Sequence, residues 1–206
     1  FASPILQHPL ADGADAVVYS TTKYIGGHSD VVGGAVLVND PEVADAVAFL
    51  QNAAGAVPSP FDSWLDIRGL KTLGLRVRKH SANALEIAQW LERRPEIERV
   101  WYPGLESHPG HEIAARQMHG GFGGMISVQL AGGPEAAQRF ASSTRLFTLA
   151  ESLGGVESLI EVPAAMTHAS VSGTTLEVPA NLVRLSIGIE DDGDLIADLE
   201  QALQQL

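Results

Sequence analysis

Strand-like and helix-like segments alternate along most of this chain, and this alternation restricts the fold more than any other feature. The strand-like runs are rich in β-branched and apolar residues and cover 97–102, 123–131, 146–150 and 182–189. The helix-like segments carry apolar residues at helical spacing and cover 111–118, 134–143 and 194–206. Short strands interleaved with helices predict an α/β layer whose sheet is antiparallel or mixed.

The first part of the chain predicts two further strands followed by a helix. The runs 14–20 and 34–38 are short and apolar, and we expect both to be buried strands. Asp40 before Pro41 is typical of a helix start, because an aspartate caps the first amides and proline suits the first turn. Gly55 provides the matching end, because glycine readily adopts the left-handed conformation that closes a helix.

A long helix is expected next, over about 60–94. Ser59 is suited to cap its first turn, and apolar residues recur behind it at helical spacing. Gly69 and Gly74 are weak points at which so long a helix can bend. The helix would bridge two domains, 1–76 and 77–206.

Composition argues against several classes of partner. The chain has 206 residues, 45% of them hydrophobic, which is enough for a sizeable core. Its 13 basic and 25 acidic residues give a formal charge of −12, which disfavours nucleic acid and anionic membranes as partners. No apolar run approaches the roughly 20 residues of a membrane-spanning helix. The absence of cysteine rules out disulfides and thiolate metal sites and fits a cytoplasmic location.

Lys23 is the first candidate for chemistry. It follows a predicted strand that ends at Ser20, and the glycines of a tight turn come soon after it. Ser20 and Thr22 lie two residues apart, so both hydroxyls can face one side, and the amides of the turn add donors for an anion. A phosphate beside a lysine amine indicates a nucleotide or pyridoxal 5′-phosphate, whose aldehyde needs an amine to form a Schiff base. An ordinary surface lysine is the competing interpretation.

Nucleotide-binding motifs are missing from this stretch. The pattern G-x-x-x-x-G-K-[ST] needs glycines before its lysine, whereas here they follow Lys23. No strand leads into G-x-G-x-x-G either. The chemistry of the residues therefore favours pyridoxal 5′-phosphate over a nucleotide.

The residues around Lys23 resemble a known cofactor-lysine motif. Positions 20–30 read S-T-T-K-Y-I-G-G-H-S-D, similar to the motif of the Cys/Met-metabolism family of pyridoxal-phosphate enzymes. Five further blocks resemble that family in the same order along the chain, at 61–76, 102–111, 123–128, 150–170 and 182–191. The resemblance therefore extends over nearly the whole chain.

This resemblance implies a fold and a mode of cofactor binding. The fold would be the α/β fold type I of pyridoxal-phosphate-dependent transferases, with the end of the large cofactor domain followed by a smaller C-terminal α/β domain. Lys23 would hold the cofactor covalently as the internal aldimine, and Ser20 and Thr22 would bind its phosphate. The chain, which begins FASPILQHPL, would correspond to the C-terminal half or more of such an enzyme.

Three residues nearer the C-terminus are expected to bind substrate. Arg184 lies between Val183 and Leu185, which alternate towards a core, so its side chain faces the other way. A guanidinium matches a carboxylate bidentately, and by resemblance Arg184 binds the α-carboxylate of the substrate. A structural ion pair is the competing interpretation. By the same resemblance Ser152 lines that end of the site, and Glu151, at a position that tends to be acidic in family members that handle cystathionine or cysteine, can meet the distal ammonium of cystathionine.

The reaction that the resemblance implies is a γ-replacement. An O-acylated homoserine, either O-succinyl- or O-acetylhomoserine, would react with cysteine to form cystathionine, as in trans-sulfuration and methionine biosynthesis. The alternative is γ-elimination of cystathionine to cysteine, 2-oxobutanoate and ammonia. Methionine γ-elimination, sulfhydrylation of O-acetylhomoserine and a non-catalytic subunit are less favoured. The partners implied are small amino-acid substrates, the N-terminal part of the same enzyme, and further copies in a homotetramer.

Histidines do not form a convincing metal site. His108, His111 and His119 lie close together in the sequence. The helix-like segment that starts at His111 has alanine at position 115, where the zinc motif H-E-x-x-H requires a second histidine. We therefore expect no metal.

We expect the 206-residue chain on its own to lack activity. In the family, the tyrosine stacked on the cofactor ring, the aspartate paired with the ring nitrogen and the glycine-rich phosphate loop precede the lysine strand. Lys23 without them has neither a bound cofactor nor an electron sink. The measurement is turnover by the purified chain with pyridoxal 5′-phosphate and amino-acid substrates, and measurable turnover would contradict the expectation.

Overall fold

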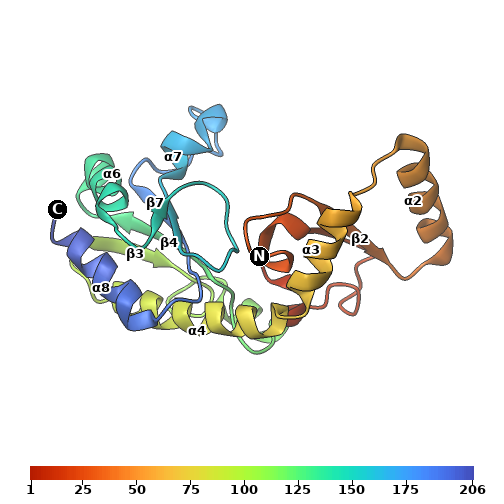
Figure 1. Cartoon of the computed structure of the whole chain (residues 1–206). Helices are drawn as coiled ribbons and strands as arrows, with labels where there is room; N and C mark the ends of the chain where they lie inside the picture. Colours follow the sequence, from red (N-terminus) through yellow and green to blue (C-terminus); the bar gives the residue numbers. More distant parts are fainter.

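A computed structural model describes residues 1–206, apart from the side chain of Ala169. The N-terminal elements are α1 (Ser3–Leu6), β1 (Ala16–Ser20), the π-helical turn η1 (Thr21–Ile25), β2 (Gly34–Val38), α2 (Pro41–Ala54) and α3 (Pro60–Leu70). Helix α4 (Leu73–Leu91) leads from them to a five-stranded sheet (Figure 1). The remaining elements are β3 (Ile97–Trp101), α5 (His111–Gln117), β4 (Met125–Leu130), α6 (Gly133–Ser143), β5 (Thr148–Leu149), β6 (Leu159–Glu161), α7 (Pro163–Met166), η2 (Ala169–Val171), β7 (Leu182–Ser186) and α8 (Asp192–Leu203). This mixture of helices and strands confirms the expected α/β class.

Strands β1 and β2 form a small antiparallel sheet in which Ser20 lies opposite Gly34. The sequence predicts both strands, and the structure confirms them. The prediction that they are buried is wrong, because Val18 is 76% exposed and Val36 is 50% exposed. The physical reason is that each strand has only one neighbour in this sheet, and two strands alone bury little apolar surface.

Helix α2 begins and ends where its sequence predicts. The Asp40 carboxylate accepts hydrogen bonds from the backbone amides of Glu42 (2.8 Å) and Val43 (3.3 Å). Gly55 follows the last turn with φ of 74°, the left-handed conformation that favours glycine. Both helix-end predictions are therefore confirmed.

The single long helix expected over about 60–94 is wrong, because the chain forms two helices, α3 and α4. Ser59 does cap α3, since its hydroxyl accepts from the amide of Asp62 at 3.1 Å. The break follows Gly69, whose carbonyl accepts from the Thr72 amide (3.2 Å) and from the Arg76 guanidinium (2.8 Å). A continuous helix would need that carbonyl for the amide four residues further on. The helix therefore ends near the glycines named above as weak points.

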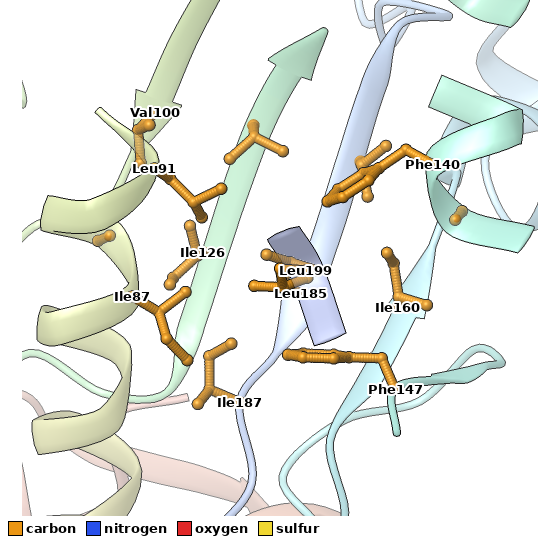
Figure 2. Packing of buried hydrophobic residues seen from close by; sticks show 14 of the residues in the cluster. Ile87, Leu91, Val100, Ile126, Phe140, Phe147, Ile160, Leu185, Ile187 and Leu199 are labelled. Carbon is orange, nitrogen blue, oxygen red and sulfur yellow. The ribbon is translucent and has the colours of Figure 1, made fainter. Parts of the chain in front are cut away.

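The larger sheet has the strand order β3-β4-β7-β6-β5 and is mixed, as predicted. Strands β5 and β6 are parallel and the other neighbours are antiparallel. Figure 2 shows apolar side chains from α4, α6 and α8 meeting those of the sheet, among them Leu91, Phe140 and Leu199. All three are fully buried, as are Ile126 on β4 and Leu185 on β7. The main core therefore lies between this sheet and its helices.

Most elements of this larger part match the sequence prediction. Strands β3, β4 and β7 and helix α5 fall within the expected segments, whereas α6 begins one residue and α8 two residues before theirs. Strand β5 covers only Thr148–Leu149 of the expected run 146–150, and β6 was not predicted. Strand β6 is only three residues long and ends in the charged Glu161, so neither its length nor its composition is typical of a strand.

Helix α4 contributes side chains to two separate apolar clusters. Leu73 and Val77 pack in a smaller cluster with η1, while Ile87 and Leu91 belong to the main core. The proposed domain boundary between residues 76 and 77 lies inside this helix, and the division into 1–76 and 77–206 stays a prediction. Within the described residues, no helix combines the length and apolarity needed to cross a membrane.

The buried carboxylate of Asp198 holds the segment that enters β5. Asp198 lies on α8, is 5% exposed, and accepts hydrogen bonds from the backbone amides of Arg145 (2.8 Å), Leu146 (2.8 Å) and Phe147 (3.1 Å). Bonds from three successive amides fix the chain just before the loop that follows β5. That loop carries two of the predicted site residues, Glu151 and Ser152.

Replacing Asp198 with alanine should lower the free energy of unfolding of the full-length protein by about 3 kcal/mol, because buried amides lose a charged acceptor. Chemical denaturation is the measurement. The control is Glu200→Ala on the same helix, where an exposed ion pair with Arg94 at 3.7 Å is worth about 1 kcal/mol or less. A loss for Asp198→Ala no larger than that of the control would contradict the role given to Asp198.

Candidate active site

Lys23 lies in an irregular turn between β1 and β2. The carbonyl of Thr21 accepts from the amide of Gly26 at 2.8 Å, five residues on, which defines the wide π-helical turn η1. Within this turn Lys23 has φ of −92° and ψ of −129°, far from helical values. The backbone therefore changes direction at the lysine itself.

The Lys23 amine contacts a segment that is distant in the sequence. Its Nζ donates a hydrogen bond to Ser152 Oγ at 2.8 Å. Ser152 lies in the loop between β5 and β6, and its carbonyl accepts from Arg184 Nη2 at 2.7 Å. The structure thus brings three of the predicted residues together, with Ser152 between the two cations.

Ser152 has an unusual backbone conformation. Its φ of 76° lies in the left-handed region that favours glycine. Such a residue costs on the order of 1–3 kcal/mol and persists only where its surroundings fix it. Here the fixing contacts include the amide of Gly154, which donates to the buried hydroxyl of Ser186 on β7 at 3.0 Å. The loop is therefore held in the shape that presents Ser152 to Lys23.

Arg184 lies on β7 opposite Glu161 of the neighbouring strand β6. Val183 and Leu185 on either side are fully buried, which confirms the predicted alternation. The Arg184 side chain is 20% exposed and forms an ion pair with Glu161, with 2.9 Å between Nη2 and Oε2. Glu161 is 1% exposed, and its Oε1 also accepts from the Thr167 hydroxyl at 3.2 Å.

The ion pair with Glu161 leaves some hydrogen-bond donors of the Arg184 guanidinium without a partner among the described residues. Nη2 makes both polar contacts, to Glu161 and to the Ser152 carbonyl. Among the described residues, neither Nε nor Nη1 of Arg184 has a hydrogen-bond partner. The structure therefore contains the structural ion pair and still leaves donors for a substrate carboxylate.

An open cleft of about 750 Å³ lies between the lysine segment and the loop of Ser152. Its walls include Thr22, Asp30, Val32, Glu151, Ser152 and Glu157. Glu157 Oε1 also accepts a hydrogen bond from the Ser29 hydroxyl. The cleft is rich in carboxylates, so it favours a ligand that carries an ammonium group.

Thr22 and Ser20 differ in how far their hydroxyls are engaged. Thr22 Oγ1 accepts from the amide of Gly33 at 3.0 Å and donates to the Gly33 carbonyl at 3.3 Å. The second bond is long for a hydroxyl donor, so a phosphate oxygen can replace the carbonyl as its acceptor. Ser20 is exposed at the end of β1, and no hydrogen bond of its hydroxyl occurs within the described part of the chain. An amine with two available hydroxyls fits pyridoxal 5′-phosphate.

Neutral buried rings lie behind the lysine. Burial raises the pKa of the Tyr24 hydroxyl well above its usual value, and its ring meets that of His80 edge to face, with 5.2 Å between centroids. His80 Nδ1 lies 2.6 Å from the carbonyl oxygen of Ile187. Because a carbonyl can only accept a hydrogen bond, Nδ1 carries the proton. Burial lowers the pKa of His80. These two rings therefore add no charge behind the lysine.

Sequence reasoning missed Glu161, Tyr24, His80 and Arg76 as parts of the site. One signal was available for Glu161, because a charged residue inside the apolar run LIEV is unusual unless it is paired. Arg76 gave the same signal, since it stands directly before the core residue Val77. Nothing in the sequence relates Tyr24 to His80, which are brought together only by the packing of α4 on η1.

Two of the three histidines considered for zinc make hydrogen bonds to nearby backbone groups. His111 starts α5, as predicted, and its Nδ1 lies 2.8 Å from the carbonyl of Pro103. His108 accepts from the amide of Gly110 at 3.0 Å. Across the described residues, no group of three or more histidine, aspartate or glutamate side chains is arranged to hold a metal ion.

A family model for "Cys/Met metabolism PLP-dependent enzyme" matches residues 1–204. The chain belongs to this family. It is 66% identical to the cystathionine gamma-synthase of Mycobacterium tuberculosis (strain ATCC 25618 / H37Rv) over 98% of the chain and 52% of that protein. It is 53% identical to the cystathionine gamma-lyase of Saccharomyces cerevisiae over 100% of the chain and 53% of that protein.

Solved structures give the same family. The crystal structure of metB from Corynebacterium glutamicum matches with a TM-score of 0.97 and 61% identity, over 100% of the chain and 53% of that structure. This likeness confirms the fold predicted from the resemblance, and family membership confirms the pyridoxal-phosphate-dependent class. The chain spans about half the length of the curated relatives it matches.

The ion pair between Arg184 and Glu161 should be asymmetric in its effect on stability. Removing the guanidinium in Arg184→Gln leaves a buried carboxylate without its cationic partner and should cost about 3 kcal/mol. Glu161→Gln should cost less, because Arg184 is partly exposed and can be hydrated. In the double variant the cost should fall below the sum of the two single costs.

The measurement is a double-mutant cycle from denaturation of the full-length protein. Arg145→Gln is a matched control, since its exposed side chain lies outside the site. Equal costs for the two single variants, or strict additivity in the double variant, would contradict the pairing.

Proposed function

We propose that the full-length protein containing this chain is a pyridoxal-phosphate-dependent cystathionine γ-synthase. The observation that carries the proposal is a pair of hydrogen bonds to Ser152. The Lys23 amine donates to its hydroxyl, and the Arg184 guanidinium donates to its carbonyl. This arrangement supports a site in which Lys23 binds the cofactor and Arg184 binds the carboxylate of an amino acid, with Ser152 fixing the distance between them. The 66% identity to a mycobacterial synthase supports the choice of reaction within the family.

The proposed roles follow from the donors that each residue offers. Lys23 Nζ holds the cofactor covalently, and the hydroxyls of Ser20 and Thr22 bind its phosphate. The free Nε and Nη1 of Arg184 bind the α-carboxylate of the substrate. Pyridoxal 5′-phosphate, when bound, supplies the electron sink that stabilises negative charge on the substrate carbons.

Proton transfer is assigned to Lys23. With substrate bound, Lys23 Nζ would take the proton from the substrate Cα and return it at the end. Ser152 Oγ accepts a hydrogen bond from this amine and so orients it. Ser152 itself is held by Arg184, so the base and the carboxylate-binding group are positioned by the same residue.

Glu151 is the residue that we expect to favour sulfur-containing diamino substrates. It is exposed and lines the cleft beside Ser152. Its carboxylate can meet the ammonium group of incoming cysteine, which becomes the distal ammonium of cystathionine. In this reaction the Cγ–O bond of the O-acylhomoserine breaks, a Cγ–S bond to cysteine forms, and the carboxylic acid leaves.

Elimination of cystathionine to cysteine, 2-oxobutanoate and ammonia is the second candidate. The observation in its favour is the 53% identity to a yeast γ-lyase over the whole chain. The same side chains serve both reactions, because the two differ in whether cysteine attacks or leaves. The higher identity to synthases places replacement first.

The proposal includes an assembly and a location. We infer a homotetramer, supported by apolar side chains of α3 that are exposed in the single chain, among them Phe61 (66%), Trp64 (52%) and Ile67 (57%). We place the protein in the cytoplasm, for which the lack of cysteine is the support. The N-terminal part of the same enzyme completes the cofactor site in this proposal.

Product analysis of the full-length protein tests the proposed reaction. With pyridoxal 5′-phosphate and cysteine, O-succinylhomoserine or O-acetylhomoserine should give cystathionine faster than cystathionine alone gives 2-oxobutanoate and ammonia. The relative rates with the two donors identify the acyl group. Faster breakdown of cystathionine than synthesis from either donor would overturn the first candidate in favour of the lyase.

Lys23→Ala should abolish the visible absorbance of lysine-bound pyridoxal 5′-phosphate and lower turnover by at least about 10³-fold, because both the covalent link and the base are lost. Lys71→Ala is the matched control, since Lys71 is exposed in the connection between α3 and α4. Retention of the absorbance band in Lys23→Ala would contradict the assignment.

A further inference from the structure

The turn that carries Lys23 ends in carbonyls that cannot be satisfied within the turn. A helix leaves its last carbonyls without partners of its own. In η1 the carbonyls of Thr21 and Lys23 accept from the amides of Gly26 and Gly27, both at 2.8 Å. The next two carbonyls, of Tyr24 and Ile25, need donors from elsewhere.

Both donors come from the guanidinium of Arg76 on α4. Its Nη1 donates to the Tyr24 carbonyl at 2.7 Å, and its Nη2 donates to the Ile25 carbonyl at 3.1 Å. Nη2 also donates to the Gly69 carbonyl at the end of α3, at 2.8 Å. Nε donates to the Thr72 hydroxyl at 3.1 Å. One side chain therefore joins the lysine turn to the break between α3 and α4.

This guanidinium is deeply buried. Arg76 is 4% exposed, and burial lowers its pKa. The acceptors described above are all neutral oxygens. Burying a charge is costly unless hydrogen bonds replace those that it made with water. The buried position of the Arg76 guanidinium therefore depends on these four hydrogen bonds.

Two glycines leave room for the Arg76 junction, by which we mean the contacts of the Arg76 guanidinium with the lysine turn and with the break between α3 and α4. A Cβ atom at Gly27, where φ is 69°, would overlap the Arg76 guanidinium. A Cβ atom at Gly69 would lie 2.5 Å from the carbonyl oxygens of Ile25 and Gly26. Close approach of the turn, α3 and the guanidinium therefore requires glycine at both positions.

The same junction holds the loop that carries Ser152. The Gly27 carbonyl accepts from the amide of Val156 at 3.1 Å. A Cβ atom at Gly154 would lie 2.8 Å from the amide nitrogen of Tyr24, so the loop also packs directly on the turn. Both partners of the bond between Lys23 and Ser152 thus depend on the backbone that Arg76 fixes.

We propose that Arg76 is a positioning residue for Lys23, holding the turn so that Nζ stays at Ser152 Oγ. Arg76 acts through the carbonyls of Tyr24 and Ile25 and touches neither substrate nor cofactor. The inference rests on the proposed function, in which Lys23 is the cofactor lysine. Its structural part, that Arg76 fixes the turn, does not.

The test uses Arg76→Lys in the full-length protein. An ammonium cannot reproduce the planar fork that serves all four acceptors, so the turn should loosen while the fold persists. Hydrogen exchange at the amides of Gly26, Gly27 and Val156 should speed up by about tenfold to a hundredfold. Exchange in β4 and β7 should stay unchanged.

Cofactor binding gives a second readout. The dissociation constant for pyridoxal 5′-phosphate should rise by about tenfold, and kcat should fall while KM for the acyl donor stays within about twofold, since the substrate contacts remain. Arg78→Lys is the matched control, because Arg78 lies two residues further on α4 with an exposed side chain. It should match the parent in exchange and in affinity.

Several results would overturn the proposal. Unchanged exchange at Gly26 and Gly27 would show that Arg76 does not fix the turn. Equal acceleration in β4 and β7 would show a general loss of stability. If Arg76→Lys does not fold, Thr72→Val keeps the guanidinium and removes the acceptor of Nε, together with the hydroxyl's own hydrogen bond to the Gly69 carbonyl at 3.3 Å. It should give the same pattern with a smaller increase, and no increase would overturn the proposal.

Failure of the proposed function would look different. If Lys23→Ala keeps full cofactor affinity, Lys23 is not the cofactor lysine, and the proposed function fails. Exchange at Gly26 and Gly27 in Arg76→Lys then still reports whether Arg76 fixes the turn.

Discussion

The hydrogen bond between Lys23 and Ser152 is the contact on which the candidate site depends. It joins two segments 129 residues apart in the sequence, one following β1 and the other following β5. Neither segment is regular structure at the contact, since Lys23 interrupts a helical turn and Ser152 has a positive φ. Each segment is therefore fixed by a hydrogen bond to its backbone. Arg76 donates to the Tyr24 carbonyl of the lysine turn, and Ser186 accepts from the Gly154 amide of the serine loop.

Electrostatics then divides the site into two regions. Arg184 is a partly buried cation whose charge is balanced by the fully buried Glu161. The carboxylate balances the charge of the guanidinium without occupying all its donors, which is compatible with the proposed role of Arg184 in binding a substrate carboxylate. On the open side of Ser152 the walls are acidic, with Glu151 and Glu157 facing the cleft. An amino acid with a second ammonium group matches this arrangement of charge at both ends.

Local sequence signals predicted local structure well. Asp40, Gly55 and Ser59 mark helix ends correctly because each acts on amides or torsions within a few residues. The motif around Lys23 likewise led to the cofactor and the family. The long helix over 60–94 is wrong because the Gly69 carbonyl, which would continue it, accepts from the Thr72 amide and the Arg76 guanidinium instead. Glycine at this position marked the weak point in the sequence, but periodicity alone did not show that the helix breaks there.

The parts of the site that sequence reasoning missed are held by contacts across the fold. Glu161 meets Arg184 only because β6 and β7 are neighbours, and β6 is too short to predict. Arg76 reaches a turn about 50 residues earlier in the chain. The exposure of β1 and β2 also depends on which elements lie beside them, which their own apolar pattern does not reveal. Periodicity identifies a core face, but it does not identify the partner that covers it.

Identification of the lysine that carries the cofactor tests the central claim most directly. The chain contains only three lysines, Lys23, Lys71 and Lys79. The full-length protein, loaded with pyridoxal 5′-phosphate, is treated with borohydride so that the cofactor is fixed to its lysine, and is then digested and mapped by mass spectrometry. The account predicts that the reduced cofactor is found on the peptide that contains Lys23. Finding it on Lys71, on Lys79 or on a lysine outside this chain would contradict the account.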